Sequence, residues 1–205
     1  MIFVNEYGQI IPHQQLEITE QRQADTYINN EHIVLELGAR YGTVSCIINK
    51  KTSKLVSVEP DERVHAALEY NMVSNGCYFN IIKGVISRTI MNLVAKDSYA
   101  GYGTISVKSD SSTIKSFTLE EIEETYSLHF NALVADCEGF LEQFFDKNPK
   151  LYCQLKLVIF EKDNCNTCNY DKIINNLRNN NFEQIEDGTH QVWHKLPTKY
   201  TEPLQ

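Results

Sequence analysis

Short apolar runs alternate with amphipathic segments between residues 33 and 177, and this alternation constrains the fold more than any other feature. The run Ile33–Leu37 is apolar except for Glu36 and stops at Gly38, as expected for a strand buried on both faces. Further strands are predicted over 55–58, 79–85, 132–135 and 155–160. Helices are predicted over 43–51, 61–74, 119–126, 140–145 and 170–177, the first three capped by Thr43, Asp61 and Thr118. Such alternation with short connections predicts a parallel sheet covered by helices on both faces.

Three segments depart from the alternation. A polar helix is predicted over 16–29, within an N-terminal helical segment 1–30. Residues 87–117 contain several short β-like pieces, which indicates an insertion or flap over the edge of the sheet. The runs 182–185 and 191–193 flank Asp187-Gly188, a dipeptide suited to a two-residue hairpin turn. We therefore expect a single domain over residues 1–205, whose sheet ends in an antiparallel hairpin.

Charge and hydropathy limit the classes of partner and the cellular compartment that we expect for this chain. The chain has 205 residues with 27 acidic and 19 basic side chains, a net charge of −8, which disfavours nucleic-acid partners because phosphate backbones are repelled. No apolar run approaches the ~20 residues of a membrane span, and no signal peptide is evident. We expect an intracellular, cytoplasmic protein with no membrane span. The six histidines show no zinc-like spacing, so no metal is predicted.

A glycine-containing loop follows the first predicted strand, where open parallel sheets bind ligands. In the stretch Glu36-Leu37-Gly38-Ala39-Arg40-Tyr41-Gly42, the two glycines allow a sharp turn and a close approach of the backbone to a ligand. Glu36 can accept hydrogen bonds from an ammonium or a hydroxyl group. A glycine pair of this kind is a weak signal by itself. With the next strand it predicts five cofactor-binding residues: Glu36, Gly38, Ala39, Tyr41 and Gly42.

Glu59 ends the second predicted strand, where a carboxylate can accept both hydroxyls of a ribose. The alternative is that Glu59 only stabilises the N-terminus of the next helix. We expect an adenine between Pro60 and the pair Gly84-Val85. The spacing Gly-x-x-x-Gly differs from the Gly-x-Gly-x-x-Gly that binds the pyrophosphate of a dinucleotide. A ligand with a ribose and an ammonium but no pyrophosphate fits these residues better, and S-adenosylmethionine is such a ligand.

A further motif follows the fourth predicted strand. Residues 133–142 read Leu-Val-Ala-Asp-Cys-Glu-Gly-Phe-Leu-Glu and resemble the Asp-x-Glu-Gly-x-Glu block of FkbM-type methyltransferases, which are similar also at Phe117-Thr118-Leu119 and at Val158-Ile159-Phe160-Glu161. The resemblance spans nearly the whole chain. It implies the Rossmann-like α/β fold of class I methyltransferases, with a mostly parallel seven-stranded sheet, a C-terminal antiparallel hairpin and helices on both faces. It also implies S-adenosyl-L-methionine as cofactor and S-adenosyl-L-homocysteine as product.

Asp136 and Glu138 are the predicted catalytic residues. Two carboxylates that leave a strand together can hold the ammonium of the cofactor, orient an acceptor hydroxyl or share a proton, so Asp136 is also a candidate cofactor ligand. The alternative is that Glu138 caps the next helix and Gly139 permits the turn.

The acidic charge and the resemblance together predict O-methylation of a small hydroxylated acceptor such as a sugar or nucleotide-sugar. Methylation of protein side chains or RNA, and a catalytically degenerate S-adenosylmethionine-binding partner subunit, remain as alternatives. The sequence leaves a homo-oligomer open.

Overall fold

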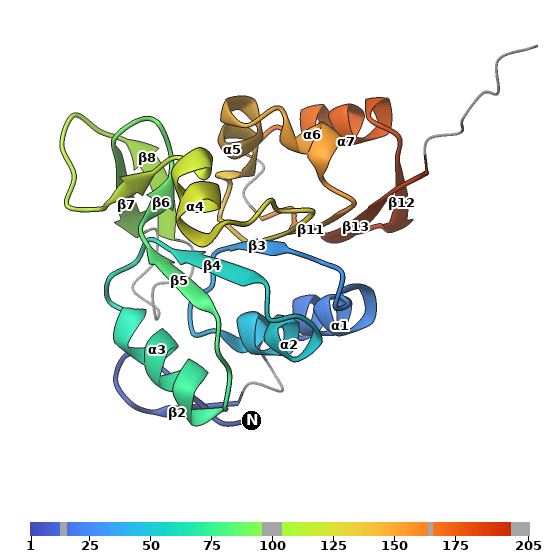
Figure 1. Ribbon diagram of the computed structural model, residues 1–205. Helices are drawn as coiled ribbons and strands as arrows, with labels where there is room; N and C mark the ends of the chain where they lie inside the picture. The colour runs from blue at the N-terminus through green and yellow to red at the C-terminus, as the bar shows by residue number, and fades with distance from the viewer. Residues whose placement is uncertain (13–15, 96–103, 164–165, 198–205) are drawn as a thin grey trace, which may run out of the picture.

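A seven-stranded sheet forms the centre of the protein (Figure 1). The structure is a computed structural model and describes residues 1–12, 16–95, 104–163 and 166–197. The strand order in the sheet is β12-β13-β11-β10-β3-β4-β5. These strands are β3 (Val34–Leu37), β4 (Leu55–Glu59), β5 (Asn80–Lys83), β10 (Ala132–Ala135), β11 (Leu157–Glu161), β12 (Phe182–Glu186) and β13 (His190–Lys195).

Parallel pairing joins β5, β4, β3, β10 and β11, whereas β13 pairs antiparallel with both β11 and β12. The predicted fold class, a mostly parallel sheet that ends in an antiparallel hairpin, is therefore confirmed. Each of the five parallel strands overlaps the segment predicted for it. β3, β4 and β10 are buried along their whole length, because helices cover both faces of the sheet.

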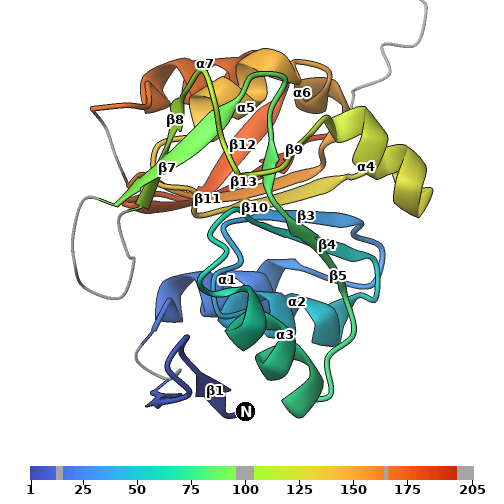
Figure 2. The same cartoon turned by 90° about the vertical axis from the view of Figure 1, so that its left-hand side faces the viewer.

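Helices cover both faces of the sheet, as the two views in Figures 1 and 2 show. On the first face lie α1 (Ile18–Tyr27), α2 (Thr43–Lys51) and α3 (His65–Ser74). On the second lie α4 (Leu119–Tyr126), α5 (Leu141–Lys147), α6 (Leu151–Gln154) and α7 (Tyr170–Asn179). Each layer has its own core. Ala24, Ile48 and Leu68 pack under the first face, and Phe144 and Trp193 belong to the core on the second.

Several local expectations are wrong. The cap of α2 is Gly42 without a side-chain hydrogen bond, because the Thr43 hydroxyl donates to Glu17 instead. The third helix begins at His65 rather than after Asp61, whose carboxylate accepts from the Arg63 backbone in a turn. The N-terminal segment holds a short β1–β2 hairpin (Phe3–Val4 and Ile10–Ile11) before α1. The last hairpin turns through three residues, 187–189, rather than two.

Residues 85–117 leave the main sheet. The predicted strand over 79–85 ends at Lys83, and β6 (Val85–Ile86) pairs in parallel with β9 (Ser116–Phe117). Between them, β7 (Met91–Ala95) and β8 (Thr104–Lys108) form an antiparallel hairpin. The connection between β7 and β8, residues 96–103, lies outside the described residues.

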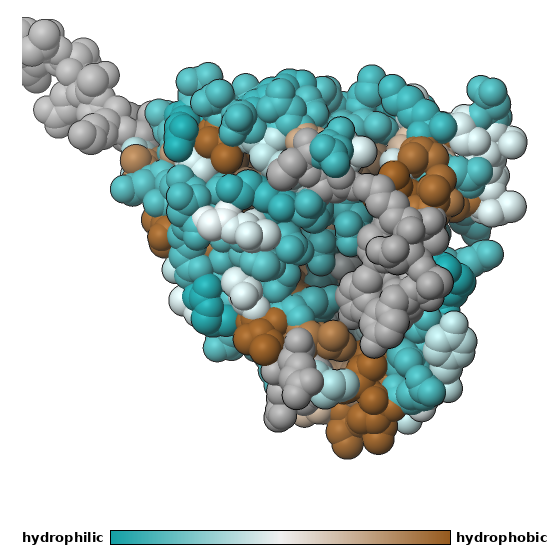
Figure 3. Space-filling model, turned by 180° about the vertical axis from the view of Figure 1, so that it is seen from behind, coloured by the Kyte–Doolittle hydropathy of each residue, from teal (hydrophilic) through white to brown (hydrophobic). Residues whose placement is uncertain are grey.

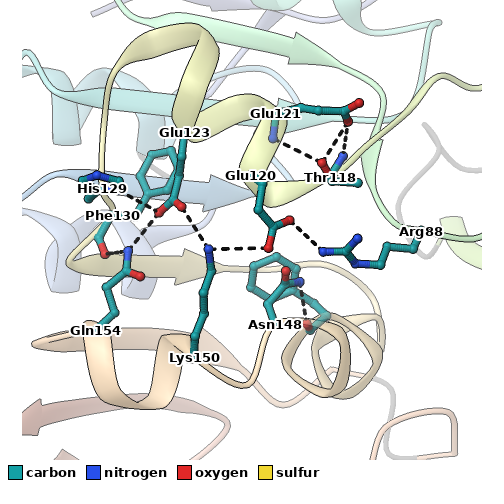
Figure 4. Close-up of polar contacts among 11 residues, drawn as sticks. Arg88, Thr118, Glu120, Glu121, Glu123, His129, Phe130, Asn148, Lys150 and Gln154 are labelled. Atoms are coloured by element: carbon teal, nitrogen blue, oxygen red, sulfur yellow. Dashed lines mark hydrogen bonds and ion pairs between the residues drawn. The ribbon is translucent and has the colours of Figure 1, made fainter.

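Helix α4 holds the base of this insertion through a polar network (Figure 4). The predicted cap Thr118 is confirmed, since its hydroxyl and Glu121 form a reciprocal capping box. Glu120 accepts from Arg88 at 2.9 Å, which ties the helix to the segment before β7. On the other side, the buried Glu123 accepts from Lys150 at 3.1 Å.

The surface carries scattered apolar side chains. Figure 3 shows hydrophilic residues over most of the back of the molecule, with the apolar ones in separate clusters. Within the part of the chain that the structure describes, no helix is long and apolar enough to cross a membrane.

Candidate functional site

A crevice opens beyond the carboxyl ends of β3, β4 and β10. It encloses about 740 Å³ of space not filled by protein atoms, the open mouth included. Seven of the eleven predicted site residues line it: Gly38, Glu59, Pro60, Gly84, Val85, Asp136 and Glu138. Because strands β3, β4 and β10 are adjacent and parallel, the residues that follow them meet at one edge of the sheet.

Gly38, directly after β3, lies close to the backbone of Asp136, directly after β10. Its φ is +88°, and a Cβ atom there would lie 1.7 Å from the Asp136 carbonyl oxygen. The backbone N–H of Asp136 in turn donates to the Leu37 carbonyl at 3.0 Å. Residue 38 must therefore be glycine for backbone reasons, and the same contact holds Asp136 beside the loop.

Glu59 is buried at the end of β4 and organises two loops. One carboxylate oxygen accepts from the backbone N–H of Asp61 at 2.7 Å, and the other accepts from the backbone N–H of Arg40 at 2.8 Å. Burial raises the pKa of Glu59 to about 7, although these hydrogen bonds act in the opposite direction. Each oxygen still has a second lone pair for a ligand hydroxyl.

Asp136 lines the crevice from the end of β10. None of the hydrogen bonds and ion pairs in the described part of the chain involves its carboxylate. The residue keeps some exposed surface because it borders the crevice, while the carboxyl group itself lies deep in the fold. Burial, followed by the neighbouring carboxylates of Glu161 and Glu17, raises the pKa of Asp136 well above its usual range. Such a group is suited to bind a cation or to accept a proton.

Glu138 lies in the turn between β10 and α5, next to Asp136. Glu138 and Gly139 both have positive φ, 51° and 85°. Helix α5 begins only at Leu141, and no side chain caps it. The turn therefore needs an unusual backbone at Glu138, and the N-cap residue of α5 is Phe140 rather than Glu138.

Four predicted residues do not line the crevice: Glu36, Ala39, Tyr41 and Gly42. Glu36 is buried one layer below, where its carboxylate accepts hydrogen bonds from the hydroxyls of Ser45 and Ser57. Tyr41 is buried and donates to Glu6. Successive side chains of a strand point to opposite faces. A residue that is next to the glycine-containing loop in sequence therefore does not have to point into the crevice.

The buried Glu36 predicts a measurable pH dependence of stability. Burial raises its pKa to about 7 from 4.5. The folded protein therefore keeps a proton that the unfolded chain releases, and the stability present below about pH 4.5 is lost as the pH rises to about 7. Glu36→Gln has no ionisable group, so its stability relative to the wild type is expected to rise between pH 5 and pH 7.5 in urea unfolding. Glu124→Gln, on an exposed glutamate, is the control, and an equal response of both variants to pH would contradict the expectation.

The sequence reasoning missed Glu17, which lines the crevice from the start of α1. Its backbone is left-handed, with φ 50°, and its carboxylate accepts from the Thr43 hydroxyl. Burial raises the pKa of Glu17 to about 7. Arg40 and the hairpin residues Leu93, Thr104 and Ser106 also contribute to the walls. No motif signals these residues, because they reach the crevice from segments with no fixed spacing to the strands.

Comparisons with known proteins identify the fold. No family model matches the sequence, and no curated protein matches it either. Among solved structures, an rRNA methylase from Streptococcus thermophilus has a TM-score of 0.54 and 9% identity over 87% of this chain and 95% of that one. Precorrin-6y C5,15-methyltransferase from Geobacter metallireducens has a TM-score of 0.52 and 10% identity over 91% and 90% of the two chains.

A third similar structure was solved in complex with S-adenosyl-L-methionine. It is a Streptococcus pneumoniae protein assigned provisionally as a tRNA (m1A22) methyltransferase, with a TM-score of 0.51 and 11% identity over 89% of this chain and 75% of that one. Identities this low show the fold alone. The chain has the Rossmann-like fold of class I S-adenosylmethionine-dependent methyltransferases.

Proposed function

We propose that this chain is a single-domain, FkbM-type methyltransferase that transfers a methyl group from S-adenosyl-L-methionine to a hydroxyl oxygen of a small acceptor, such as a sugar or nucleotide-sugar. One observation carries the proposal: the carboxylate of Asp136, which has no hydrogen-bond partner among the described residues, and the buried carboxylate of Glu59 lie on the wall of one crevice at the carboxyl ends of parallel strands.

The residues of the crevice fit this cofactor. Glu59 would accept the ribose hydroxyls, and the apolar wall of Val58, Val85 and Ile86 would hold the adenine. The methionyl ammonium and the sulfonium both carry positive charge, and the carboxylates of Glu17 and Asp136 offer the opposite charge on the same wall. The bound cofactor would supply an activated methyl group with a good leaving group.

Asp136 is the candidate group for the acceptor. Its raised pKa brings it nearer to the pH at which a carboxylate accepts a proton efficiently. An acceptor hydroxyl that donates a hydrogen bond to Asp136 would be oriented by that bond. When the hydroxyl oxygen takes the methyl group, its proton would pass to the Asp136 carboxylate. Alignment of this kind accounts for much of the rate of transfer reactions.

The hairpin β7–β8 is the candidate flap. Leu93, Thr104 and Ser106 line the crevice from it, so β7 and β8 would cover the bound molecules and select among acceptors. The FkbM block is present at Asp136, Glu138 and Gly139, while Glu142 lies one residue further along than in Asp-x-Glu-Gly-x-Glu.

One observation favours a second candidate, methylation of RNA. A groove beside the crevice is lined by Arg63, His65, Lys83 and Lys115, and basic grooves bind phosphate backbones. However, Arg63 pairs with Asp61 and Lys83 pairs with Glu69. These ion pairs neutralise two of the cations, and the net charge is −8, so the small acceptor remains the first candidate.

Two measurements test the proposal. Calorimetric titration of the full chain with S-adenosylhomocysteine is expected to show one site per chain, and absence of binding would overturn the cofactor assignment. Methyl transfer is then measured over a panel of sugars, nucleotide-sugars, peptides and RNA. Turnover on a hydroxylated small molecule supports the proposal, turnover on RNA or peptide alone replaces the acceptor class, and binding without turnover indicates a degenerate partner subunit.

Glu59→Ala is expected to weaken S-adenosylhomocysteine binding by about 1.5–3 kcal/mol, the scale for hydrogen bonds to a charged group. The matched control is Glu62→Ala, because Glu62 is an exposed neighbour that does not line the crevice. Since Glu59 also holds two backbone groups, unfolding of each variant is measured in parallel. Equal affinity in the folded Glu59→Ala protein and in the control would exclude the ribose assignment.

A further inference from the structure

Three side chains from distant parts of the chain meet at the carboxyl end of β11. Glu161 ends β11 and is the register partner of His190, the first residue of β13. Glu20 approaches from α1, with its carboxylate 2.6 Å from His190 Nε2, while Glu161 lies 3.5 Å from the same nitrogen. One ligand atom of each residue lies within 4.8 Å of the other two. All three are at least three-quarters buried by side-chain exposure.

A second observation concerns the small cavity beside this cluster. Glu17, Glu20, Glu36, Asp136 and Glu161 all line it, so five carboxylates border one cavity. Asp136, which has no partner in the described part of the chain, is among them. Carboxylates this close repel one another unless a cation or protons lie between them. Burial and the neighbouring acids raise the pKa of Glu161 even though His190 acts in the opposite direction.

We propose that Glu20, Glu161 and His190 bind a divalent transition-metal ion such as Mn²⁺ or Zn²⁺. An imidazole nitrogen among carboxylates favours such ions over Mg²⁺ or Ca²⁺, which prefer oxygen ligands only. Metal–ligand distances of about 2.0–2.2 Å place ligand atoms about 3 Å apart around an ion. The pair Glu161–His190 is close to this spacing. Glu20 and His190 now share a hydrogen bond and would separate by roughly half an ångström.

The site adjoins the crevice, because the cavity and the crevice share Glu17, Gly38 and Asp136. An ion with three protein ligands keeps open positions, and a hydroxyl bound there would have a lowered pKa beside the Asp136 carboxylate. This role in the acceptor step rests on the proposed function, whereas the metal site itself does not.

The test uses the full chain, freed of metal with a chelator and without cofactor. Titration with Mn²⁺ at pH 7.5, followed by electron paramagnetic resonance, is expected to show one bound ion per chain, displaced by Zn²⁺ and poorly displaced by Mg²⁺. His190→Gln and Glu161→Gln are each expected to weaken Mn²⁺ binding at least tenfold. His129→Gln is the matched control, because His129 pairs with Glu123 at 3.8 Å far along the sheet from this cluster.

Two results would overturn the site: no saturable Mn²⁺ or Zn²⁺ binding by the wild type up to millimolar metal, or unchanged affinity in folded Glu161→Gln. The second result would leave the cluster as a set of polar contacts between His190 and two glutamates. Two variants are tested in case one of them does not fold, and thermal unfolding in the absence of metal identifies a variant that is not folded. S-adenosylhomocysteine binding is measured separately, so that its loss counts against the proposed function and loss of Mn²⁺ binding counts against the metal site.

Discussion

Gly38→Ala is expected to destabilise the protein by about 3–5 kcal/mol, a large fraction of the ~5–15 kcal/mol that stabilise a typical domain. A methyl group at residue 38 would meet the Asp136 carbonyl oxygen at 1.7 Å, and this oxygen belongs to backbone that cannot turn away. The φ of +88° adds the strain of a left-handed conformation. The measurement is the free energy of unfolding in urea.

Gly76→Ala is the control that separates these two contributions. Gly76 has a φ of +67°, and a Cβ atom there would meet nothing within 4 Å. We expect a loss of about 1 kcal/mol from conformation alone. If Gly38→Ala cost no more than Gly76→Ala, the close approach of β3 and β10 would not be as described.

Asp136→Asn is expected to lower turnover by about 10²-fold or more on the acceptor found in the panel, while the protein still folds. Asparagine keeps the volume and removes the charge, and losses of this size are typical of acid–base or positioning groups. Folding is expected to survive because the native carboxylate makes no hydrogen bond that the described structure would lose. The measurement is methyl transfer at saturating S-adenosylmethionine.

Cofactor affinity in Asp136→Asn then assigns the role of the residue. Affinity for S-adenosylhomocysteine that falls as much as the rate would place Asp136 against the methionyl ammonium, and unchanged affinity would place it against the acceptor hydroxyl. We expect the second result, because Glu17 also lines the crevice and offers a second carboxylate for the methionyl ammonium. Asp171→Asn, on an exposed side chain of α7 that does not line the crevice, is the control. Full turnover in Asp136→Asn would move the search to the residues of β7 and β8.

Most of the sheet is predictable because its central strands are buried on both faces. The strand predicted over 132–135 matches β10 residue for residue, since a short apolar run between polar neighbours leaves little freedom for the ends of a strand. The break at Gly84 has no local signal in the sequence. A Cβ atom at Gly84 would lie 2.3 Å from the Lys115 carbonyl oxygen, and this close tertiary contact accompanies the redirection of the chain from β5 into β6.

The candidate site also contains some residues that the sequence predicts and others that it does not. Glu59 and Asp136 follow strands that the pattern identifies, so their common edge could be inferred from chain order. Glu36 also belongs to such a strand, yet Ser45 and Ser57 enclose it, and only the packing of α2 reveals this. The cluster of Glu20, Glu161 and His190 depends on the antiparallel register between β11 and β13, which no residue spacing encodes.

The position of β13 between β11 and β12 has a consequence for the order of assembly. β12 precedes β13 in the chain, yet among the described strands it pairs with β13 alone, so β12 cannot join the sheet ahead of it. A hairpin of neighbouring residues forms within microseconds, whereas pairing of β13 with β11 closes a longer loop. We therefore expect β12 and β13 to pair with each other first and then to pair together with the edge of β11. Until that docking, β11 presents unpaired backbone groups along one side, and after it β12 becomes the edge strand of the sheet, so the risk of edge-to-edge pairing with another chain passes from β11 to β12.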